Sequence, residues 1–415
     1  MSETVQRTTV DLISDCVHCG FCLPACPTYL SWGVEADSPR GRIDLMKGLA
    51  EGTLTLDGSV VEHFDRCLGC MACMTACPSG VRYDLLIEST RAKVEAQAPR
   101  PFFERMFRAM IFAIFPYPRR LLALAPLMNL GAVLGLQRLI RGGGLLPRID
   151  IAAAQQPLAE RTAAQGTPRA RVGMLAGCVQ RVMFPQVNAA SVRVLAAEGC
   201  DVIVPADAGC CGALSLHSGR LEEAKALARK LIERFEREDL GAIVVNVAGC
   251  GSAMKEYGEL FAGEPEWAAR AQAFAARVRD INEFLGQLEP RAPRHRIDAT
   301  IAYHDACHLA HAQRIRQEPR DLLCGIPGVE LVEIPNGDQC CGSAGTYNLF
   351  QPESAREIGE RKVGNVMSTG ATVVASANPG CTLQMQALLR ERGVEMTILH
   401  PVEILDASIA GRGIG

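Results

Sequence analysis

The second half of the chain, residues 171–415, alternates short apolar runs with stretches in which apolar residues recur at helical spacing. Residues 185–199 and 221–235 predict helices, and the β-branched runs 243–247 and 373–375 predict strands. Such alternation is typical of parallel sheets covered by helices. We therefore expect an α/β fold in this half.

The same half contains an internal repeat. Each unit carries a single cysteine, then Cys-Cys-Gly (CCG), then another single cysteine, and the corresponding landmarks lie 129, 130 and 131 residues apart, which indicates a duplication. The cysteines follow predicted strands, and ligand sites in open α/β sheets lie at the carboxyl ends of strands, so we expect them to face clefts. The eight residues are Cys178, Cys210, Cys211 and Cys250 in the first unit, and Cys307, Cys340, Cys341 and Cys381 in the second.

Residues 1–95 combine short helical patterns with two cysteine quartets, each spaced C-x2-C-x2-C-x3-C-P. A [4Fe–4S] cluster takes four thiolates, and in this spacing three of them wrap one cluster while the fourth serves the other. Zinc sites use two C-x2-C pairs, so zinc leaves the third cysteine of each quartet unexplained. We expect one cluster on Cys16, Cys19, Cys22 and Cys77, and a second on Cys67, Cys70, Cys73 and Cys26.

The 40 residues between the quartets favour an α-helical two-cluster ferredoxin domain over the compact β-containing type. Ser38 is a predicted N-cap, followed by Pro39 at the first helical position. Nearby arginines could raise the cluster potentials, or they could be ordinary surface residues. These are Arg40, Arg42, Arg66 and Arg82.

The middle segment, 96–170, has no cysteine and alternates arginines with apolar stretches. Its longest uncharged run, 121–137, has 17 residues, whereas a spanning helix takes about 20, so we do not expect a transmembrane helix. A basic amphipathic segment can lie on an anionic membrane, or it can pack between domains or against a partner subunit; we favour packing. The arginines are Arg105, Arg108, Arg119, Arg120, Arg138, Arg141 and Arg148.

Composition narrows the class of protein. The 415 residues are 48% hydrophobic and 21% charged, as in a globular protein, and the net charge of −3 gives no basic excess for nucleic acid. The polar start lacks the apolar core of a secretory signal, so the 18 cysteines should stay reduced, and clustered reduced cysteines bind metal more often than they form disulfides. The remaining two, Cys200 and Cys324, are expected to be small buried hydrophobic residues.

Three histidines flank the cysteine that opens the second unit. A helix starting near Ala306 would place His304, His308 and His311 on about one face. They could carry protons or hydrogen bond to cluster sulfurs, and ordinary core or surface roles are equally open.

Five segments carry a resemblance to a known family: CVHCGFC (16–22), ACPSGVRY (76–83), AGCGSAMKEYG (248–258), HLAHAQ (308–313) and CCGSAGTYNL (340–349). The duplicated CCG pattern resembles the cysteine-rich domains of heterodisulfide reductase. Two ferredoxin quartets followed by two such domains resemble the iron–sulfur subunits of glycolate oxidase. Complete reductase motifs end in C-x2-C, whereas Cys250 and Cys381 stand alone here, so each unit offers four thiolates rather than five.

The resemblance implies a ferredoxin domain with two [4Fe–4S] sites, a helical connector and two CCG lobes. We expect these at 1–95, 96–170, 171–290 and 291–415. A further iron–sulfur cluster at the CCG lobes is expected, with reduced structural or redox thiols as the alternative.

The sequence lacks G-x-G-x-x-G, a P-loop and G-x-S-x-G, so we expect no flavin or dinucleotide site in this chain. Iron–sulfur clusters move single electrons, so hydride removal from a 2-hydroxy acid would fall to a flavin (FAD) on a partner subunit. The resemblance implies oxidation of glycolate to glyoxylate, with D-lactate as a second substrate, and electron delivery to a quinone or other acceptor. We expect a cytoplasmic protein, peripheral on the inner face of the membrane.

Two other functions stay open. One is the electron-transfer subunit of an anaerobic glycerol-3-phosphate or lactate dehydrogenase. The other is a thiol/disulfide enzyme similar to heterodisulfide reductase, which would use the CCG lobes themselves.

Overall fold

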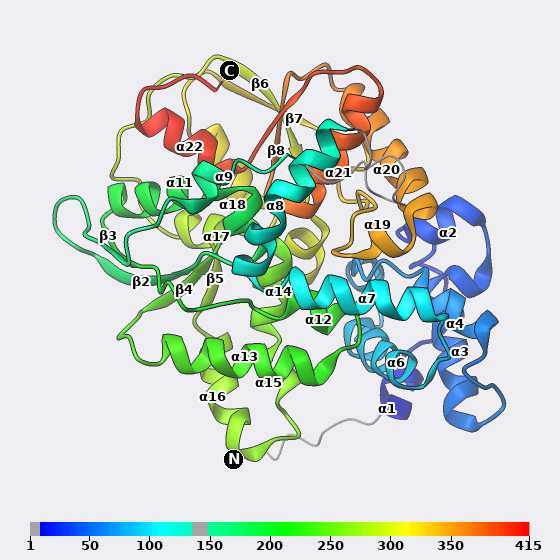
Figure 1. Cartoon of the computed structure of the whole chain (residues 1–415). Coiled ribbons are helices and arrows are strands. Elements are labelled where there is room, and N and C mark those ends of the chain that lie inside the picture. Colours follow the sequence, from blue (N-terminus) through cyan, green and yellow to red (C-terminus); the bar gives the residue numbers. More distant parts are fainter. Residues whose placement is uncertain (1–8, 135–147, 415) are drawn as a thin grey trace.

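A computed structural model describes residues 9–134 and 148–414 of the chain (Figure 1). Its N-terminal region is a group of short helices, and residues 9–97, all of them described, form no strand. Phe64, Leu86 and Ile87 are completely buried at its centre. The elements are α1 (Thr9–Ser14), α2 (Pro27–Trp32), the 3-10 turn η1 (Glu35–Asp37), α3 (Pro39–Glu51), α4 (Gly58–Asp65), α5 (Ala72–Ala76) and α6 (Tyr83–Gln97).

The start of α3 follows the predicted pattern. The hydroxyl oxygen of Ser38 accepts a hydrogen bond from the Gly41 amide at 3.0 Å, and Pro39 fixes the first helical φ. A side chain at Gly41 would meet the carbonyl oxygen of Glu35 at 2.0 Å. The turn η1 therefore packs directly on α3, and this contact holds the chain between the two quartets close to them.

The middle segment forms α7 (Phe102–Ile114), α8 (Pro118–Val133) and α9 (Ile151–Gln155), and α7 crosses beside the N-terminal helices (Figure 1). Ile111, Phe112 and Leu121 are buried against neighbouring elements, whereas the opposite faces are exposed. The expected packing thus applies to one face of these helices. Two of the arginines noted above, Arg138 and Arg141, lie outside the described residues.

The first CCG lobe contains a five-stranded sheet in the order β1-β3-β2-β4-β5, with only β1 antiparallel. Strand β1 lies within the segment expected to be connector, so this sheet begins earlier than the predicted boundary. Strand β4 reads AIVV and is buried throughout, as a parallel strand covered on both faces should be. The elements are β1 (Arg161–Thr162), β2 (Ala170–Leu175), α10 (Val179–Met183), α11 (Pro185–Ala197), β3 (Cys200–Ile203), α12 (Ala213–His217), α13 (Leu221–Phe235), β4 (Ala242–Val245), α14 (Ala248–Lys255), α15 (Tyr257–Leu260), α16 (Pro265–Ala275), β5 (Val278–Asp280) and α17 (Ile281–Gly286).

The second lobe repeats this plan with an all-parallel sheet in the order β7-β6-β8-β9. The structure therefore has the predicted order of a helical N-terminal region followed by a duplicated α/β region. The elements are β6 (Ala299–His304), the π-helix η4 (His308–Ala312), α18 (Gln317–Cys324), β7 (Val329–Glu333), α19 (Tyr347–Phe350), α20 (Pro352–Met367), β8 (Val373–Ser376), α21 (Pro379–Glu391), β9 (Thr397–Leu399) and α22 (Pro401–Ile409).

The two lobes pack reciprocally. The last helix of each lobe lies on an early helix of the other: α22 packs on α11, and α17 packs on α18. One continuous apolar core includes residues of both sheets, among them Val172 and Ile301. Arg193 of α11 and Asp406 of α22 form a bidentate ion pair, with N–O distances of 2.8 and 2.9 Å. This packing fixes how the carboxyl ends of the two sheets face each other.

Candidate metal centres

Both ferredoxin loops turn through left-handed residues on either side of their second cysteine. His18 and Gly20 have φ values of 53° and 85°, and Gly69 and Met71 have values of 64° and 61°. Left-handed geometry costs a non-glycine residue about 1–2 kcal/mol, and such strain clusters at functional sites. The matching conformations indicate that the two loops present their cysteines in the same way.

The four cysteines predicted for the second cluster line one small cavity. One of them, Cys26, reaches it from the start of α2, separate from the other three, which is the arrangement that an exchange of the fourth cysteine would require. Pro27, Met71 and Tyr83 form other parts of its wall. Four thiols around one enclosed space are the donor set of an iron–sulfur cubane, so these residues fit the group that the spacing implies. They are Cys26, Cys67, Cys70 and Cys73.

The first quartet lies nearer the surface. Cys16, Cys22 and Cys77 are half-buried and Cys19 is exposed. Burial raises the pKa of Cys16, and the nearby thiols of Cys77 and Cys19 raise it further, so Cys77 lies near the first loop. The apolar side chains beside Cys19 are exposed as well: Val17 by 67% and Phe21 by 63%.

A buried arginine lies beside the second set. Arg42 is 1% exposed, and its guanidinium donates to the His63 carbonyl oxygen at 2.6 Å and to the Thr28 hydroxyl oxygen at 3.3 Å. Burial alone would raise the pKa of Cys67, but the positive charges of Arg42 and Arg91 bring it below its usual value. Positive charge that stabilises a thiolate favours metal binding at this position.

The other three arginines differ in position. Arg40 donates to the carbonyl oxygen of His18 in the first loop at 3.1 Å. Arg66 pairs with Asp37 at 3.0 Å, and Arg82 pairs with the carboxylate of Asp84 at 2.7 Å, so nearby carboxylates neutralise both.

All eight cysteines of the CCG repeat line a single cavity of about 300 Å³. We expect the cysteines to face clefts, and both sets face the same one, because the reciprocal helix packing turns the carboxyl ends of both sheets toward each other. Leu68, Gly69 and Arg91 of the ferredoxin region contribute to the wall. Arg108 and Phe115 of the middle segment line it as well, so the cavity lies where all four parts of the chain meet.

The four cysteines are arranged in the same way in both lobes. The Cys-Cys-Gly turn is left-handed at its glycine, with φ of 78° at Gly212 and 86° at Gly342. In both lobes the first cysteine of the turn approaches the opening cysteine, and the second approaches the last cysteine. The approaches are Cys210 to Cys178 with 3.3 Å between sulfurs, Cys211 to Cys250, Cys340 to Cys307, and Cys341 to Cys381. Four convergent thiols in each lobe fit an iron–sulfur centre, as the spacing predicts.

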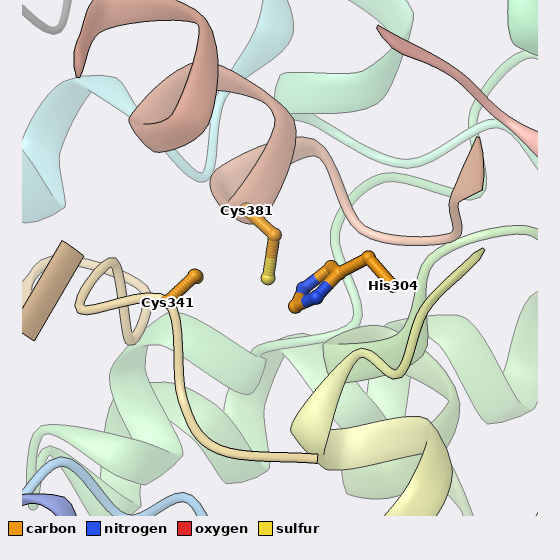
Figure 2. Close-up of side chains that lie close together, drawn as sticks. All are labelled: His304, Cys341 and Cys381. Carbon is orange, nitrogen blue, oxygen red and sulfur yellow. The ribbon is translucent and has the colours of Figure 1, made fainter. Parts of the chain in front are cut away.

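The second lobe also brings a histidine to its cysteines (Figure 2). The ligand atoms of His304, Cys341 and Cys381 all lie within 4.8 Å of one another. The pKa of Cys341 is well below its usual value because the thiols of Cys340 and Cys381 donate to its sulfur. Burial lowers the pKa of His304, so its imidazole is neutral.

The three histidines near Cys307 do not share a helix face. His304 ends strand β6, and the residues after it form a π-helix, so the expected α-helical spacing does not apply. His308 Nε2 donates to the Gly69 carbonyl oxygen at 2.9 Å, and His311 Nδ1 lies 2.7 Å from the Thr75 hydroxyl oxygen. These two histidines therefore join the second lobe to the ferredoxin region.

His217 is a cavity residue that sequence reasoning missed. Its Nδ1 lies 3.0 Å from a Glu88 carboxylate oxygen, and its ring meets that of His308 edge to face at 4.8 Å. Burial lowers the pKa of His217 to about 4 and raises the pKa of Glu88 to about 8. No local pattern could reveal a pair whose members are 129 residues apart.

The two cysteines outside the repeat differ from each other. Cys200 is buried in β3, as expected. Cys324 is exposed, so the expectation of a buried residue is wrong there. Leu323 occupies the buried face of α18, and the next helical position turns away from it.

Models of known protein families match most of the chain, in four separate stretches. A 4Fe-4S dicluster domain matches residues 12–81, and a cysteine-rich domain matches 172–255 and 301–386. A third model, described as the linker region of the glycolate oxidase iron-sulfur subunit, matches 103–155. The middle of the chain, which is the least distinctive part by sequence, therefore has a family match of its own.

Similar proteins carry consistent names. A probable glycolate oxidase iron-sulfur subunit of Bacillus subtilis is 35% identical, covering 97% of this chain and 96% of that protein. The glycolate oxidase iron-sulfur subunit of Escherichia coli is 35% identical over 99% and 97%. Lactate utilization protein A of an Exiguobacterium strain is 30% identical over 57% of this chain and 98% of its own length.

Among the described residues, no single helix has the length and apolar character needed to cross a membrane. Helices α7 and α8 reach that threshold only as a pair, with a bend of 114° between them.

Proposed function

The chain belongs to the family of glycolate oxidase iron–sulfur subunits, and from this premise we propose how its cysteines carry electrons. It is an electron-transfer subunit of an oxidoreductase complex and contains iron–sulfur clusters. In our proposal two [4Fe–4S] clusters are held by exchanged quartets. One set is Cys16, Cys19, Cys22 and Cys77, and the other is Cys26, Cys67, Cys70 and Cys73. The observation that carries this assignment is the cavity that the second set lines together.

In this proposal the CCG cysteines hold the centre that receives electrons next. Bound clusters accept and release one electron at a time. Burial raises the pKa of Cys70, and the next largest cause is the nearby Cys307 thiol, so the second ferredoxin set adjoins the second CCG unit. Leu68 is itself buried and packs with Cys307 and Cys340, so this junction is formed by direct contact between the two regions. At least one further iron–sulfur centre on the CCG cysteines would continue the path.

Electrons would enter at the first set. The exposed Cys19, with Val17 and Phe21 beside it, offers an apolar contact surface for a partner next to the nearest metal ligands. The partner in this proposal is an FAD-binding dehydrogenase subunit of the same complex. Its flavin would take two electrons from the substrate and pass them on singly.

The substrate follows from the relatives' names. Glycolate oxidised to glyoxylate is the reaction proposed for the complex, and the similarity to lactate utilization proteins supports D-lactate as a second substrate.

The acceptor in this proposal is a quinone that reaches the CCG cavity from a membrane surface. Arg108 of α7 and Phe115 just after it line that cavity. The outer face of α7 exposes Phe102, Phe103 and Met106, and Arg105 is exposed beside them. An apolar face with adjacent positive charge favours peripheral attachment to an anionic membrane.

Anaerobic iron and sulfide quantification tests the cluster assignment. Each cluster contributes about four irons. Cys26→Ala should lose about four, and the Cys210→Ala/Cys211→Ala double variant should lose about four from the CCG centres. Cys200→Ala is the matched control, a buried cysteine outside both sites, and should lose none. Retention of full iron by Cys26→Ala would contradict the exchanged assignment, and robust glycolate oxidation by the isolated chain would contradict the need for a flavin partner.

A further inference from the structure

The two CCG lobes are built alike but differ around their last cysteine. Strands β2 and β6 each have six residues and end at Leu175 and His304, three positions before the opening cysteine. Val247 precedes helix α14 in the first lobe, and Asn378 occupies the same place before α21 in the second. Two apolar residues of the first lobe are thus polar in the second.

A third difference lies on the helix behind the Cys-Cys-Gly turn. A side chain on the turn glycine would face the carbonyl oxygen of Ala224 in the first lobe and of Ala355 in the second, which aligns the two helices. Seven residues further on, the first lobe has Leu231 and the second has Lys362, and both are buried. The Lys362 ammonium donates to the carbonyl oxygen of Gly337 at 2.8 Å.

These polar groups lie near the last cysteines of the second CCG lobe. The Asn378 amide nitrogen donates to the Cys381 sulfur at 3.4 Å. His304 is 1% exposed, and among the described residues the Cys341 sulfur is the one candidate partner of its ring nitrogens. At least one buried ring nitrogen is therefore unpaired, which is unfavourable, and a bound species that uses its lone pair would remove this penalty.

We propose that His304 is a protein ligand of the metal centre in the second CCG lobe, where its imidazole nitrogen binds iron beside the thiolates of Cys341 and Cys381. This inference rests on the proposed function, in which the CCG cysteines hold at least one iron–sulfur centre, and it places such a centre on the four cysteines of the second lobe. The shared spacing of at most 4.8 Å between the three ligand atoms is a distance that one iron centre can span (Figure 2). The first lobe has Leu175 in this position and can offer thiolates only.

The chemistry of the second centre therefore differs from that of the first. A neutral imidazole in the ligand set leaves less negative charge on iron than thiolates alone, and histidine ligation raises the reduction potential of iron–sulfur centres. The second lobe is also the one whose Cys307 adjoins the ferredoxin thiol Cys70. His304 would thus make the centre nearest the ferredoxin clusters the better electron acceptor of the two lobes.

The test is pulsed EPR on the full-length chain, purified anaerobically with ¹⁵N-histidine and frozen at a series of poised potentials. Loss of one signal in Cys341→Ala identifies the second-lobe centre. We expect this signal to show the large nitrogen coupling of a directly bound imidazole, and His304→Ala to lose it. Added imidazole should restore it. His400→Asn removes another buried histidine of the same lobe and should leave it unchanged.

His304→Cys provides a second variant that keeps a ligand at this position. We expect it to retain iron, lose the nitrogen coupling and shift the potential of the second-lobe centre downward. A wild-type signal without strong nitrogen coupling would overturn the inference, as would coupling that survives in His304→Ala. If Cys341→Ala loses no iron, the second lobe holds no centre and this inference fails, whereas the exchanged ferredoxin assignment is decided separately by Cys26→Ala.

Discussion

The glycine of the second Cys-Cys-Gly turn should be irreplaceable for two separate reasons. Gly342 has a φ of 86°, and an added Cβ would lie 2.3 Å from the carbonyl oxygen of Ala355. Alanine in left-handed geometry costs about 1–2 kcal/mol. The overlap is with backbone, so the turn or α20 must move, and such overpacking costs about 1–3 kcal/mol more. Gly342→Ala should therefore lose about 2–5 kcal/mol.

Gly393→Ala is the matched control. Its φ is 67°, but an added Cβ there meets nothing within 4 Å. It should therefore lose only the conformational part, about 1–2 kcal/mol. Thermal unfolding of the two variants, prepared identically under anaerobic conditions, should differ by about 2–12 °C, at about 2–4 °C per kcal/mol.

The same turn places Cys340 and Cys341, so Gly342→Ala should also retain less iron per chain than Gly393→Ala. Equal melting temperatures in the two variants would show that the turn relaxes without cost, and the steric part of the reasoning would be wrong. A lower melting temperature with unchanged iron would show that the turn stabilises the lobe without positioning metal ligands.

Three further predictions follow from buried and exposed side chains. Arg42→Met breaks a buried charge network and should lose about 3–5 kcal/mol in thermal unfolding, whereas the more exposed Arg40→Met should lose much less; similar losses would refute the role of burial. Burial lowers the pKa of His400 to about 3, so the fold requires the neutral ring. The free energy of unfolding should therefore be unaffected by this histidine above pH 6.5 and should fall by about 1.4 kcal/mol per pH unit below it. His400→Asn can keep the helix cap, and its melting temperature should depend less on pH between about 6.5 and 5.5 than that of the wild type. The same pH dependence in both proteins would contradict this. Phe102→Ser/Phe103→Ser should reduce flotation with anionic vesicles, and unchanged flotation would count against membrane attachment.

Local chemistry made much of the fold predictable from sequence. Ser38 followed by Pro39 marks a helix start whatever lies around it, and the structure has that cap. The helix predicted for residues 221–235 has those bounds, because its buried positions recur at helical spacing. The strand predicted at 373–375 is extended by one residue in β8.

What could not be predicted depends on contacts between distant segments. Reciprocal packing of the lobes turns both sets of CCG cysteines into one cavity, and no spacing within a lobe encodes it. The pairing of His217 with Glu88 has the same origin. The predicted helical face that includes His304 is wrong for a local reason, since α-helical spacing does not extend across the end of a strand and a π-helix.

The duplication itself now has a physical explanation. Each lobe covers its partner with its last helix, so the fold needs two lobes even if electron transfer uses them unequally. The stabilising packing involves both copies, whereas the three polar residues that replace apolar ones lie in the second copy. Buried polar groups such as His304 and Lys362 destabilise a core unless something compensates for their desolvation. The first lobe has Leu175 and Leu231 at these two positions. The polar residues of the second lobe therefore lower its stability, which is consistent with a role in binding metal.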